Sequence, residues 1–411
     1  MTNYSLAKEF YASRGIDTEA AIQRAALIPL SIHCWQGDDV GGFEGGSLDG
    51  GLAATGNYPG KARNVDELRA DIEQSIALIP GPKRLSLHTF YADTRGKKVA
   101  RDEIAPEHFD NWIEWGKAAG VPLDFNHSYF AHPFSADGLT LSHPDKKIRE
   151  FWIRHGKASR RIADAFGKAF NTRCVNNCWA PDGYKDTPFD RVAPRERLLD
   201  ALDQVFAEKL PNQLDAVECK LFGVGCESYT VGSHEFYMGY AVTRQKLLCL
   251  DVGHFHPTET LTDKISSVAP FVPGVLLHLS RGVRWDSDHV VTFTDDLLAT
   301  VEQALNVMPA DRIFLALDYF DASINRIAAW AIGARNVRKA MLAAFLQPRA
   351  TLAKAEDGFD FSTRLAVQEE AKTYPLGAVW DEACRRASTP LDGEWMAAVK
   401  QYEKNHLAKR K

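Results

Sequence analysis

The segment between residues 246 and 320 contains the runs KLLCLDVGH (246–254), PGVLLHLSR (273–281), TDDLLATVEQALNVM (294–308) and RIFLALDYF (312–320). The first, second and fourth are short, apolar and of strand length. The run 294–308 has apolar residues recurring every three and four positions, which is typical of an amphipathic helix. Strands that alternate with helices in this way are typical of repeated βα units around a parallel sheet.

The same alternation extends through the preceding part of the chain. Further strand-like runs lie at 28–35, 83–90, 121–130, 173–179 and 215–223, and helical patterns lie between them at 65–79, 107–120, 146–170 and 196–210. Eight strands alternating with helices predict an α/β fold, a (β/α)8 or TIM barrel. A doubly wound open sheet is the alternative, but no G-x-G-x-x-G follows the first strand, so dinucleotide binding has no support.

We assign residues 1–345 to the barrel domain and 346–411 to a C-terminal helical extension rich in Ala, Glu, Lys and Leu. The extension either packs against the barrel or clasps a neighbouring subunit as an oligomerisation arm. The glycine-rich stretch 37–62 lacks helical periodicity and is interpreted as a lid or substrate loop.

Composition narrows the function classes. The chain has 411 residues, 45% of them hydrophobic, with 49 Lys and Arg against 54 Asp and Glu. Without a basic block, a nucleic-acid partner is not expected. The start of the chain lacks a signal-peptide pattern and no run reaches the roughly 20 apolar residues of a membrane span. The seven cysteines are odd in number and most lie in apolar runs, so a cytoplasmic location is predicted.

Carboxylates and imidazoles gather at the ends of the last four predicted strands. They are Glu218, Asp251, His254, His278 and Asp318, together with Asp286 and Asp288 in a predicted loop after the run 273–281. In a barrel the carboxyl ends of the strands meet at one mouth, so these side chains are expected to come together. Confined carboxylates repel one another unless cations are present, and seven ligands suit two divalent ions. Oxygen-rich coordination with some histidine favours Mn2+, with Co2+, Zn2+ or Mg2+ able to substitute.

Three further residues are candidates for the same mouth. Lys220 could steady an anionic oxygen, or form a structural ion pair with Glu218 or Asp251. His88 could be a hydroxyl or proton partner, and Trp179 an apolar plate against a sugar, although each is equally compatible with packing. A single buried Asp or His, such as His278, is more often a hydrogen-bonded core residue. The prediction of a metal site therefore depends on seven such residues lying at the ends of four consecutive strands.

Several longer motifs resemble one family, the L-rhamnose isomerases. They are GNYPGKA (56–62), ESYTVGSHEFYMGYA (227–241), CLDVGHFHPTE (249–259), HLSRGVRWDSDHVV (278–291) and ALDYFDASINRIAAW (316–330). The resemblance implies a metal-dependent aldose–ketose isomerase with a (β/α)8 barrel that interconverts L-rhamnose and L-rhamnulose. It also implies manganese at the catalytic site and a homotetramer.

The resemblance also implies residue roles. Glu218, Asp251, His278 and Asp318 are expected to hold a structural metal, and His254, Asp286 and Asp288 the catalytic metal through the substrate oxygens. Lys220 is expected to stabilise the ionised oxygen while Asp286 or its bound water moves the proton, and the loop around Tyr58 is expected to close over the substrate. Hydride would then pass between C1 and C2.

Two other function classes remain open from the sequence. One is another metal-dependent barrel reaction, such as sugar epimerisation or aldol cleavage, which would give a different product. The other is a catalytically silent sugar-binding or scaffold protein. Because a methyl and a hydroxymethyl group differ by only about 1–3 kcal/mol in an apolar pocket, L-lyxose and L-mannose are further candidate substrates.

Overall fold

The computed structural model describes residues 2–44, 56–220, 227–256, 258–283 and 286–410, with residues 286–288 described by their backbone only. Its central element is a closed barrel of parallel strands in the order β1-β12-β9-β8-β6-β4-β3-β2. The barrel strands are β1 (Leu30–His33), β2 (Lys83–His88), β3 (Leu123–Asn126), β4 (Cys174–Trp179), β6 (Gln213–Glu218), β8 (Leu247–Asp251), β9 (Val275–Leu279) and β12 (Ile313–Leu317). Each overlaps a predicted run, so the predicted barrel is confirmed and the open sheet is excluded.

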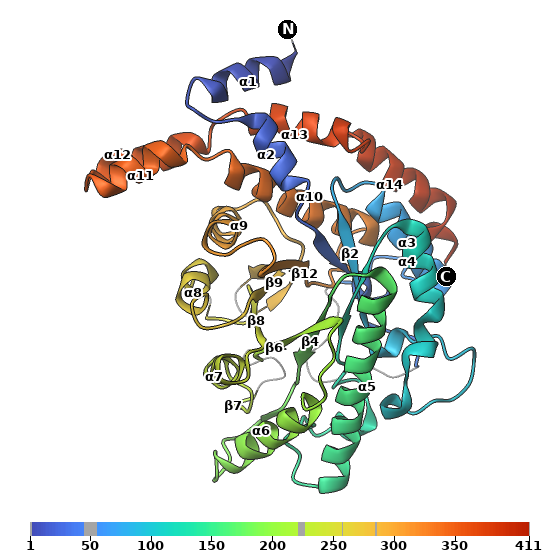
Figure 1. The fold of residues 1–411 in the computed structure, drawn as a ribbon. Coiled ribbons are helices and arrows are strands. Elements are labelled where there is room, and N and C mark those ends of the chain that lie inside the picture. The colour runs from blue at the N-terminus through green and yellow to red at the C-terminus, as the bar shows by residue number, and fades with distance from the viewer. Residues whose placement is uncertain (1, 45–55, 221–226, 257, 284–285, 411) are drawn as a thin grey trace.

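Helices surround the strands on the outside of the barrel (Figure 1). They are α3 (Val65–Ile76), α4 (Asp110–Ala119), α5 (Lys146–Phe170), α6 (Ala193–Val205), α7 (His234–Arg244), α8 (Leu261–Val268), α9 (Asp295–Val307) and α10 (Arg326–Phe345). All five predicted helical patterns are present. Two short antiparallel pairs accompany the barrel: β5 (Gly183–Tyr184) with β7 (Tyr229–Thr230), and β10 (Arg281–Val283) with β11 (Asp286–His289).

Side-chain caps explain where several of the helices begin. Asn64 accepts a hydrogen bond from the backbone N–H of Glu67 at the start of α3, and Thr294 accepts one from Leu297 at the start of α9. Asn325 accepts from both Ile327 and Ala328 at the start of α10. Each cap satisfies N–H groups that have no partner within the helix.

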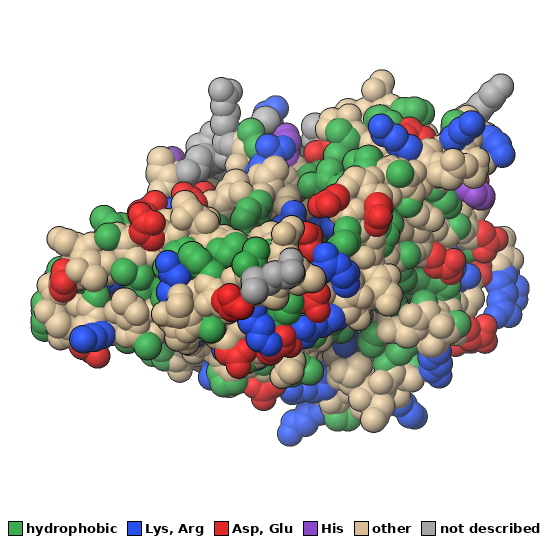
Figure 2. All heavy atoms as spheres, turned by 90° about the horizontal axis from the view of Figure 1, so that it is seen from above, with side chains coloured by type: hydrophobic (Ala, Val, Ile, Leu, Met, Phe, Trp, Pro, Cys, Tyr) green, Lys and Arg blue, Asp and Glu red, His purple; other side chains and the backbone are tan. Residues whose placement is uncertain are grey.

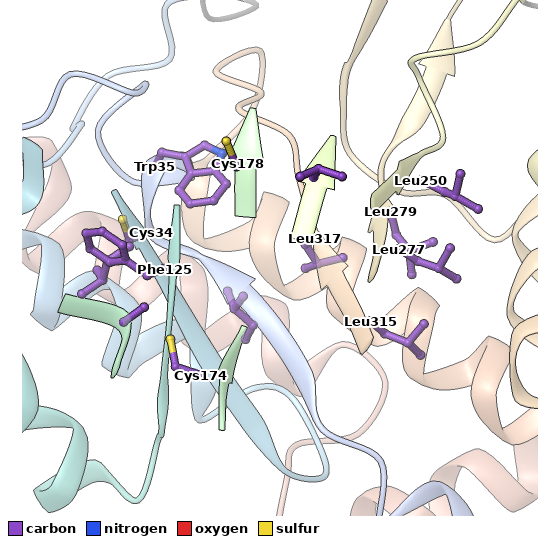
Figure 3. Packing of buried hydrophobic residues seen from close by; sticks show 14 of the residues in the cluster. Cys34, Trp35, Phe125, Cys174, Cys178, Leu250, Leu277, Leu279, Leu315 and Leu317 are labelled. Carbon is purple, nitrogen blue, oxygen red and sulfur yellow. The ribbon is translucent and has the colours of Figure 1, made fainter. Parts of the chain in front are cut away.

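Alternation along the strands separates two layers of core. Leu277, Leu279, Leu315 and Leu317 point outward and pack beneath the helices (Figure 3). The intervening positions point into the barrel, where a smaller cluster contains Val175, Ala216, Leu247, Cys249, Leu276 and Ala316. Because successive side chains of a strand point to opposite faces, the residue two positions beyond each inner apolar residue also faces inward. The inner layer therefore leads directly to the polar residues at the carboxyl ends.

Helices at both ends of the chain pack together on one side of the barrel. α1 (Asn3–Ala12) and α2 (Thr18–Ala25) share an apolar cluster with α13 (Leu376–Arg386), built around Tyr11, Val379 and Trp380. α14 (Glu394–Asn405) contributes Val399 to a second cluster with α10. None of the helices in the described residues is both long and apolar enough to cross a membrane.

The remaining pair, α11 (Arg349–Asp357) and α12 (Phe361–Ala371), forms a hairpin that projects away from the barrel (Figure 1). No residue of α12 is buried. Phe359 between the two helices is 78% exposed, and Phe361 and Leu365 are 48% and 58% exposed. In Figure 2 the hairpin is the protrusion at the left, and hydrophobic side chains are visible on its surface.

Candidate metal centre at the carboxyl end of the barrel

Four of the predicted ligands meet inside the barrel mouth. Glu218 ends β6, Asp251 ends β8, His278 lies near the end of β9, and Asp318 directly follows β12. The Nδ1 atom of His278 lies 3.0 Å from Asp318 Oδ2, 3.4 Å from Glu218 Oε2 and 3.8 Å from Asp251 Oδ2. One ligand atom from each of the four residues lies within 4.8 Å of the others. The predicted gathering of these side chains is therefore present.

A fifth predicted ligand, His254, adjoins this group. It follows β8, and its Nδ1 lies 3.2 Å from Glu218 Oε1. Glu218 Oε1 and the Nδ1 atoms of His254 and His278 are buried, and none of the three has a hydrogen-bond partner among the described residues. Buried polar atoms are almost always satisfied, so three such atoms on adjoining residues of one cluster fit a cation that accepts their lone pairs.

Each carboxylate of the cluster also accepts a hydrogen bond from the protein through one of its oxygens. Trp35 donates through Nε1 to Asp318 Oδ1 at 3.0 Å, and the backbone N–H of Gly253 donates to Asp251 Oδ1 at 2.6 Å. Asn177 donates through Nδ2 to Glu218 Oε2. Donors of this kind fix the orientation of metal ligands. Asn177 was not predicted as a site residue, although a polar side chain two positions after Val175 in a predicted strand was a usable signal.

The pKa shifts show how protons alone would balance the negative charges of this cluster. Burial raises the pKa of Asp251 to about 7, and the charges of Glu218 and Asp318 add to the rise. Burial opposes ionisation of Asp318 too, but the His278 imidazolium outweighs it and lowers the pKa to about 2. Burial lowers the pKa of His278, but its interactions with Cys249, Glu218 and Asp318 outweigh burial and raise this pKa well above its usual value. A divalent cation would take over the role of these protons.

The other half of the mouth is aromatic. A cavity opens beside the carboxylates and is lined by Trp35, Val40, His88, Asn126, His127, Phe130, Asn177, Trp179, Glu218, Asp251, His254, Asp318 and Phe320. The Trp35 and His88 rings lie 4.7 Å apart, and the Phe130 and Trp179 rings lie 5.8 Å apart. His88 and Trp179 are thus placed beside the ligand cluster.

His88 is held as a neutral imidazole. Burial lowers its pKa to about 3, and its Nδ1 lies 3.1 Å from the carbonyl oxygen of His127. A carbonyl oxygen only accepts, so Nδ1 carries the proton and Nε2 is left as an acceptor. The ring can therefore receive a hydrogen bond from a ligand hydroxyl.

Two predicted site residues, Lys220 and Tyr58, form their hydrogen bonds with residues outside the cluster of candidate metal ligands. Lys220 lies two residues beyond the end of β6, and its ammonium donates to the Pro181 carbonyl oxygen at 2.7 Å and to Glu227. Its partner is thus Glu227, whereas Glu218 and Asp251 were the sequence candidates. Burial lowers the pKa of Lys220 and Glu227 opposes that change. The Tyr58 hydroxyl donates to Glu403 of α14 at 2.6 Å.

Asp286 and Asp288, predicted ligands in a loop, belong to β11. Their backbone pairs with β10 in an antiparallel hairpin, in which Val283 lies opposite Asp286 and Arg281 opposite Asp288. Their side chains lie outside what the structure describes. The hairpin follows β9, the strand that carries His278.

A closed (β/α)8 barrel with a buried cluster of carboxylates and imidazoles at its carboxyl end defines the class of metal-dependent barrel enzymes. The sequence model of the family "L-rhamnose isomerase" matches residues 1–410 of the chain. The chain belongs to this family.

Individual relatives agree with the family match. The chain is 56% identical to the L-rhamnose isomerase of Rhodopirellula baltica, over 99% of this chain and 96% of that protein. It is 57% identical to the L-rhamnose isomerase of Escherichia coli K12, over 99% of this chain and 98% of that protein. Among solved structures, a D-psicose 3-epimerase from Clostridium cellulolyticum H10 aligns with 70% of this chain and 94% of its own, at 13% identity and a TM-score of 0.43.

Proposed function

We propose that the protein is a metal-dependent aldose–ketose isomerase that interconverts L-rhamnose and L-rhamnulose in L-rhamnose catabolism. The observation that carries the proposal is the cluster of Glu218, Asp251, His278 and Asp318, with ligand atoms within 4.8 Å of one another, beside an aromatic cavity. Membership of the L-rhamnose isomerase family supports the choice of reaction and substrate.

Two divalent metal sites are part of the proposal. Glu218, Asp251, His278 and Asp318 hold a structural metal, and His254, Asp286 and Asp288 hold the catalytic one. The mixed oxygen and nitrogen donors favour Mn2+, with Co2+, Zn2+ or Mg2+ as substitutes. When bound, the catalytic metal supplies Lewis-acid polarisation of the sugar oxygens at C1 and C2.

The side chains supply positioning and proton transfer. The neutral His88 accepts a hydrogen bond from a sugar hydroxyl, and the Trp179 ring covers an apolar face of the sugar. Asp286, directly or through water, takes the hydroxyl proton at C2 of the open-chain aldose and returns a proton to the oxygen at C1, while hydride passes from C2 to C1. Lys220 stabilises the oxygen that is ionised in between.

The Tyr58 loop and Glu227 suggest how this site changes as substrate enters. Lys220 is held by Glu227 in the structure, and a change of its rotamer would bring the ammonium to the sugar oxygen. The segment around Tyr58 closes over the substrate, with the Tyr58 bond to Glu403 as its anchor to α14.

The test is ketose formation from L-rhamnose by chelator-stripped protein, before and after addition of Mn2+, with Asp286→Asn as the control. Activity restored by metal in the wild type and absent from the variant is the expected result. If no ketose forms with any metal, and L-lyxose and L-mannose are also inert, the proposal is wrong. A product of inverted stereochemistry would instead identify another metal-dependent sugar epimerase of the barrel class.

We further propose that the protein forms a homotetramer in the cytoplasm and that residues 346–411 include its oligomerisation arm. The exposed Phe359, Phe361 and Leu365 on the projecting hairpin support an arm. The Phe359 and Phe361 rings lie 5.9 Å apart, and neighbouring exposed apolar groups mark surfaces that are buried by a partner. The six described cysteines are free and buried, which suits a reducing compartment. Light scattering of the wild type and of a Phe359→Ser/Phe361→Ser/Leu365→Ser variant tests the arm, with a tetramer and a smaller species expected.

A further inference from the structure

Cys249 occupies a distinct position among the cysteines. Of the six described, it alone belongs to the apolar cluster inside the barrel, whereas Cys34, Cys174, Cys178 and Cys219 belong to the layer beneath the helices and Cys384 to the cluster of the terminal helices. It lies on β8, two residues before Asp251, and is fully buried. In the sheet register it is paired with Glu218 of β6.

This register brings the thiol to the floor of the metal centre. The Cys249 Sγ, one oxygen of Glu218 and one ring nitrogen of His278 lie within 4.8 Å of one another. Glu218 and His278 are 2% and 4% exposed. Glu218 Oε1 and His278 Nδ1 make no well-directed hydrogen bond among the described residues. Their contacts are ion pairs, to His254 Nδ1 at 3.2 Å and to Asp318 Oδ2 at 3.0 Å, and a bound cation would replace both.

We infer that Cys249 is an alternative ligand of the structural metal position, where it joins Glu218 and His278 in a second, softer ligand set. The harder set comprises Glu218, Asp251, His278 and Asp318, so the two sets share two residues. This inference rests on the metal centre of the proposed function and adds a ligand that determines which metals the position accepts.

The chemistry of the donors gives the two sets different preferences. Carboxylate oxygens suit Mn2+ and Mg2+, whereas a thiolate suits Zn2+ and its heavier congener Cd2+. On coordination the S–H bond of Cys249 is exchanged for a sulfur–metal bond and one proton is released to the buffer, with no change of oxidation state. The thiol thus lets one position hold either a hard or a soft divalent ion.

Cobalt tests the inference directly, because a thiolate bound to Co2+ gives a charge-transfer absorption in the near ultraviolet that oxygen and nitrogen ligands do not give. Co2+ is added to the chelator-stripped full-length protein, to Cys249→Ser and to Cys249→Ala. We expect the absorption in the wild type and its loss in both variants. Cobalt bound by the wild type without this absorption would overturn the inference, as would an absorption that persists in the variants.

Matched controls keep the result specific. Cys219→Ser changes a buried cysteine next to Glu218 in sequence that lies in the outer layer. Cys226→Ser covers the one cysteine that lies outside the described residues. Both should retain the absorption, and its loss in either control but not in Cys249→Ser would contradict the assignment.

A competition experiment measures the consequence for metal choice. Cys249→Ser should lower the affinity for Cd2+ by about tenfold or more, the scale seen when groups around a metal are removed, while Mn2+ affinity changes less. An unchanged ratio of Cd2+ to Mn2+ affinity would overturn the inference. Ketose formation from L-rhamnose, measured separately with Mn2+, shows whether the proposed function fails as well.

Discussion

The two halves of the barrel mouth differ in the charge of their buried polar side chains. At the carboxyl ends of β6, β8, β9 and β12 the inward residues are Glu218, Asp251, His278 and Asp318, whose charges act on one another across a few ångströms. On β1 and β2, His33 and His88 are buried among aromatic rings, and burial lowers their pKa values to about 4 and about 3. One half therefore concentrates charge, and the other excludes it.

The difference shows that different strands of one barrel provide side chains suited to different ligands. The charged half suits a cation, and the neutral half offers apolar rings and a hydrogen-bond acceptor to a sugar. Changes to the charged half should alter metal binding, and changes to the neutral half should alter substrate binding without affecting the metal.

The largest effect is expected from Glu218→Gln, which removes a proposed metal ligand from the charged half. We expect metal content to fall and kcat/KM to drop by about 10³-fold or more. Glu218 Oε1 lies 3.2 Å from Nδ1 of His254, a proposed ligand of the catalytic metal, so loss of the structural metal would displace His254 and weaken a Lewis-acid stabilisation worth several kcal/mol. In chelator-stripped protein the same change should raise the unfolding temperature relative to stripped wild type, because one of several crowded carboxylates is removed.

Metal analysis and thermal unfolding with and without chelator provide the measurement. Glu302→Gln, which changes a carboxylate on α9 outside the mouth, is the control and should leave metal content unaltered. Full metal content in Glu218→Gln would show that the charged half does not depend on this carboxylate.

The next effect is expected from Lys220→Gln, which should lower kcat by about 10²–10³-fold, the cost of losing one electrostatic stabiliser of a developing charge. Metal content should stay the same. Because the change also leaves Glu227 without its partner, the double variant Lys220→Gln/Glu227→Gln should recover stability but not kcat. Recovery of kcat in the double variant would make Lys220 a structural residue.

The neutral half predicts a pH dependence of stability. The folded pKa values of His88 and His127 are about 3, below the 6.5 of an unfolded histidine, so below pH 6.5 the unfolded chain takes up protons that the folded chain does not. The free energy of unfolding should therefore fall as pH decreases from 6.5 towards 3, by about 1.4 kcal/mol per pH unit for each histidine.

Urea unfolding of His127→Asn and wild type at pH 7, 6 and 5, at equal metal loading, isolates one such contribution. The variant loses the bonds of His127 to Asn176 and Tyr129 at every pH, but its stability should fall less steeply. Parallel pH profiles for the two proteins would contradict a neutral buried His127.

The smallest effect is expected from His88→Asn. The asparagine amide can still donate to the His127 carbonyl, but it removes the Nε2 acceptor, so KM for L-rhamnose should rise about fivefold, corresponding to roughly 1 kcal/mol for one neutral hydrogen bond. Metal content should not change. His88→Gln, which places an amide oxygen near the Nε2 position, should restore most of the affinity, and equal KM values for both variants would place the substrate contact elsewhere.

Much of the fold could be predicted from the sequence, because the spacing of apolar residues indicates local helices and strands. The runs around Leu247, Val275 and Ile313 are short and β-branched or leucine-rich, and each formed a barrel strand. The gathering of Glu218, Asp251, His278 and Asp318 was also predictable, because parallel strands in a barrel bring their carboxyl ends to one mouth.

Other features could not be read from neighbouring residues. Lys220 is paired with Glu227, although carboxylates closer in the predicted mouth were the candidates. The Asp286 region forms a hairpin with β10 where a loop was expected. Trp35 and Asp318 are 283 positions apart in the chain and are joined by a hydrogen bond of 3.0 Å.

The sequence by itself therefore determined the alternation of strands and helices, the barrel, and the residue types that collect at its mouth, because each depends on the local period of apolar and polar positions. Only the tertiary structure decided which oxygen of each carboxylate is held by a protein donor, that His88 is neutral, and that the Cys249 thiol lies beside Glu218 and His278. These properties depend on sheet register, barrel closure and depth of burial, which are set by contacts between residues far apart in the chain.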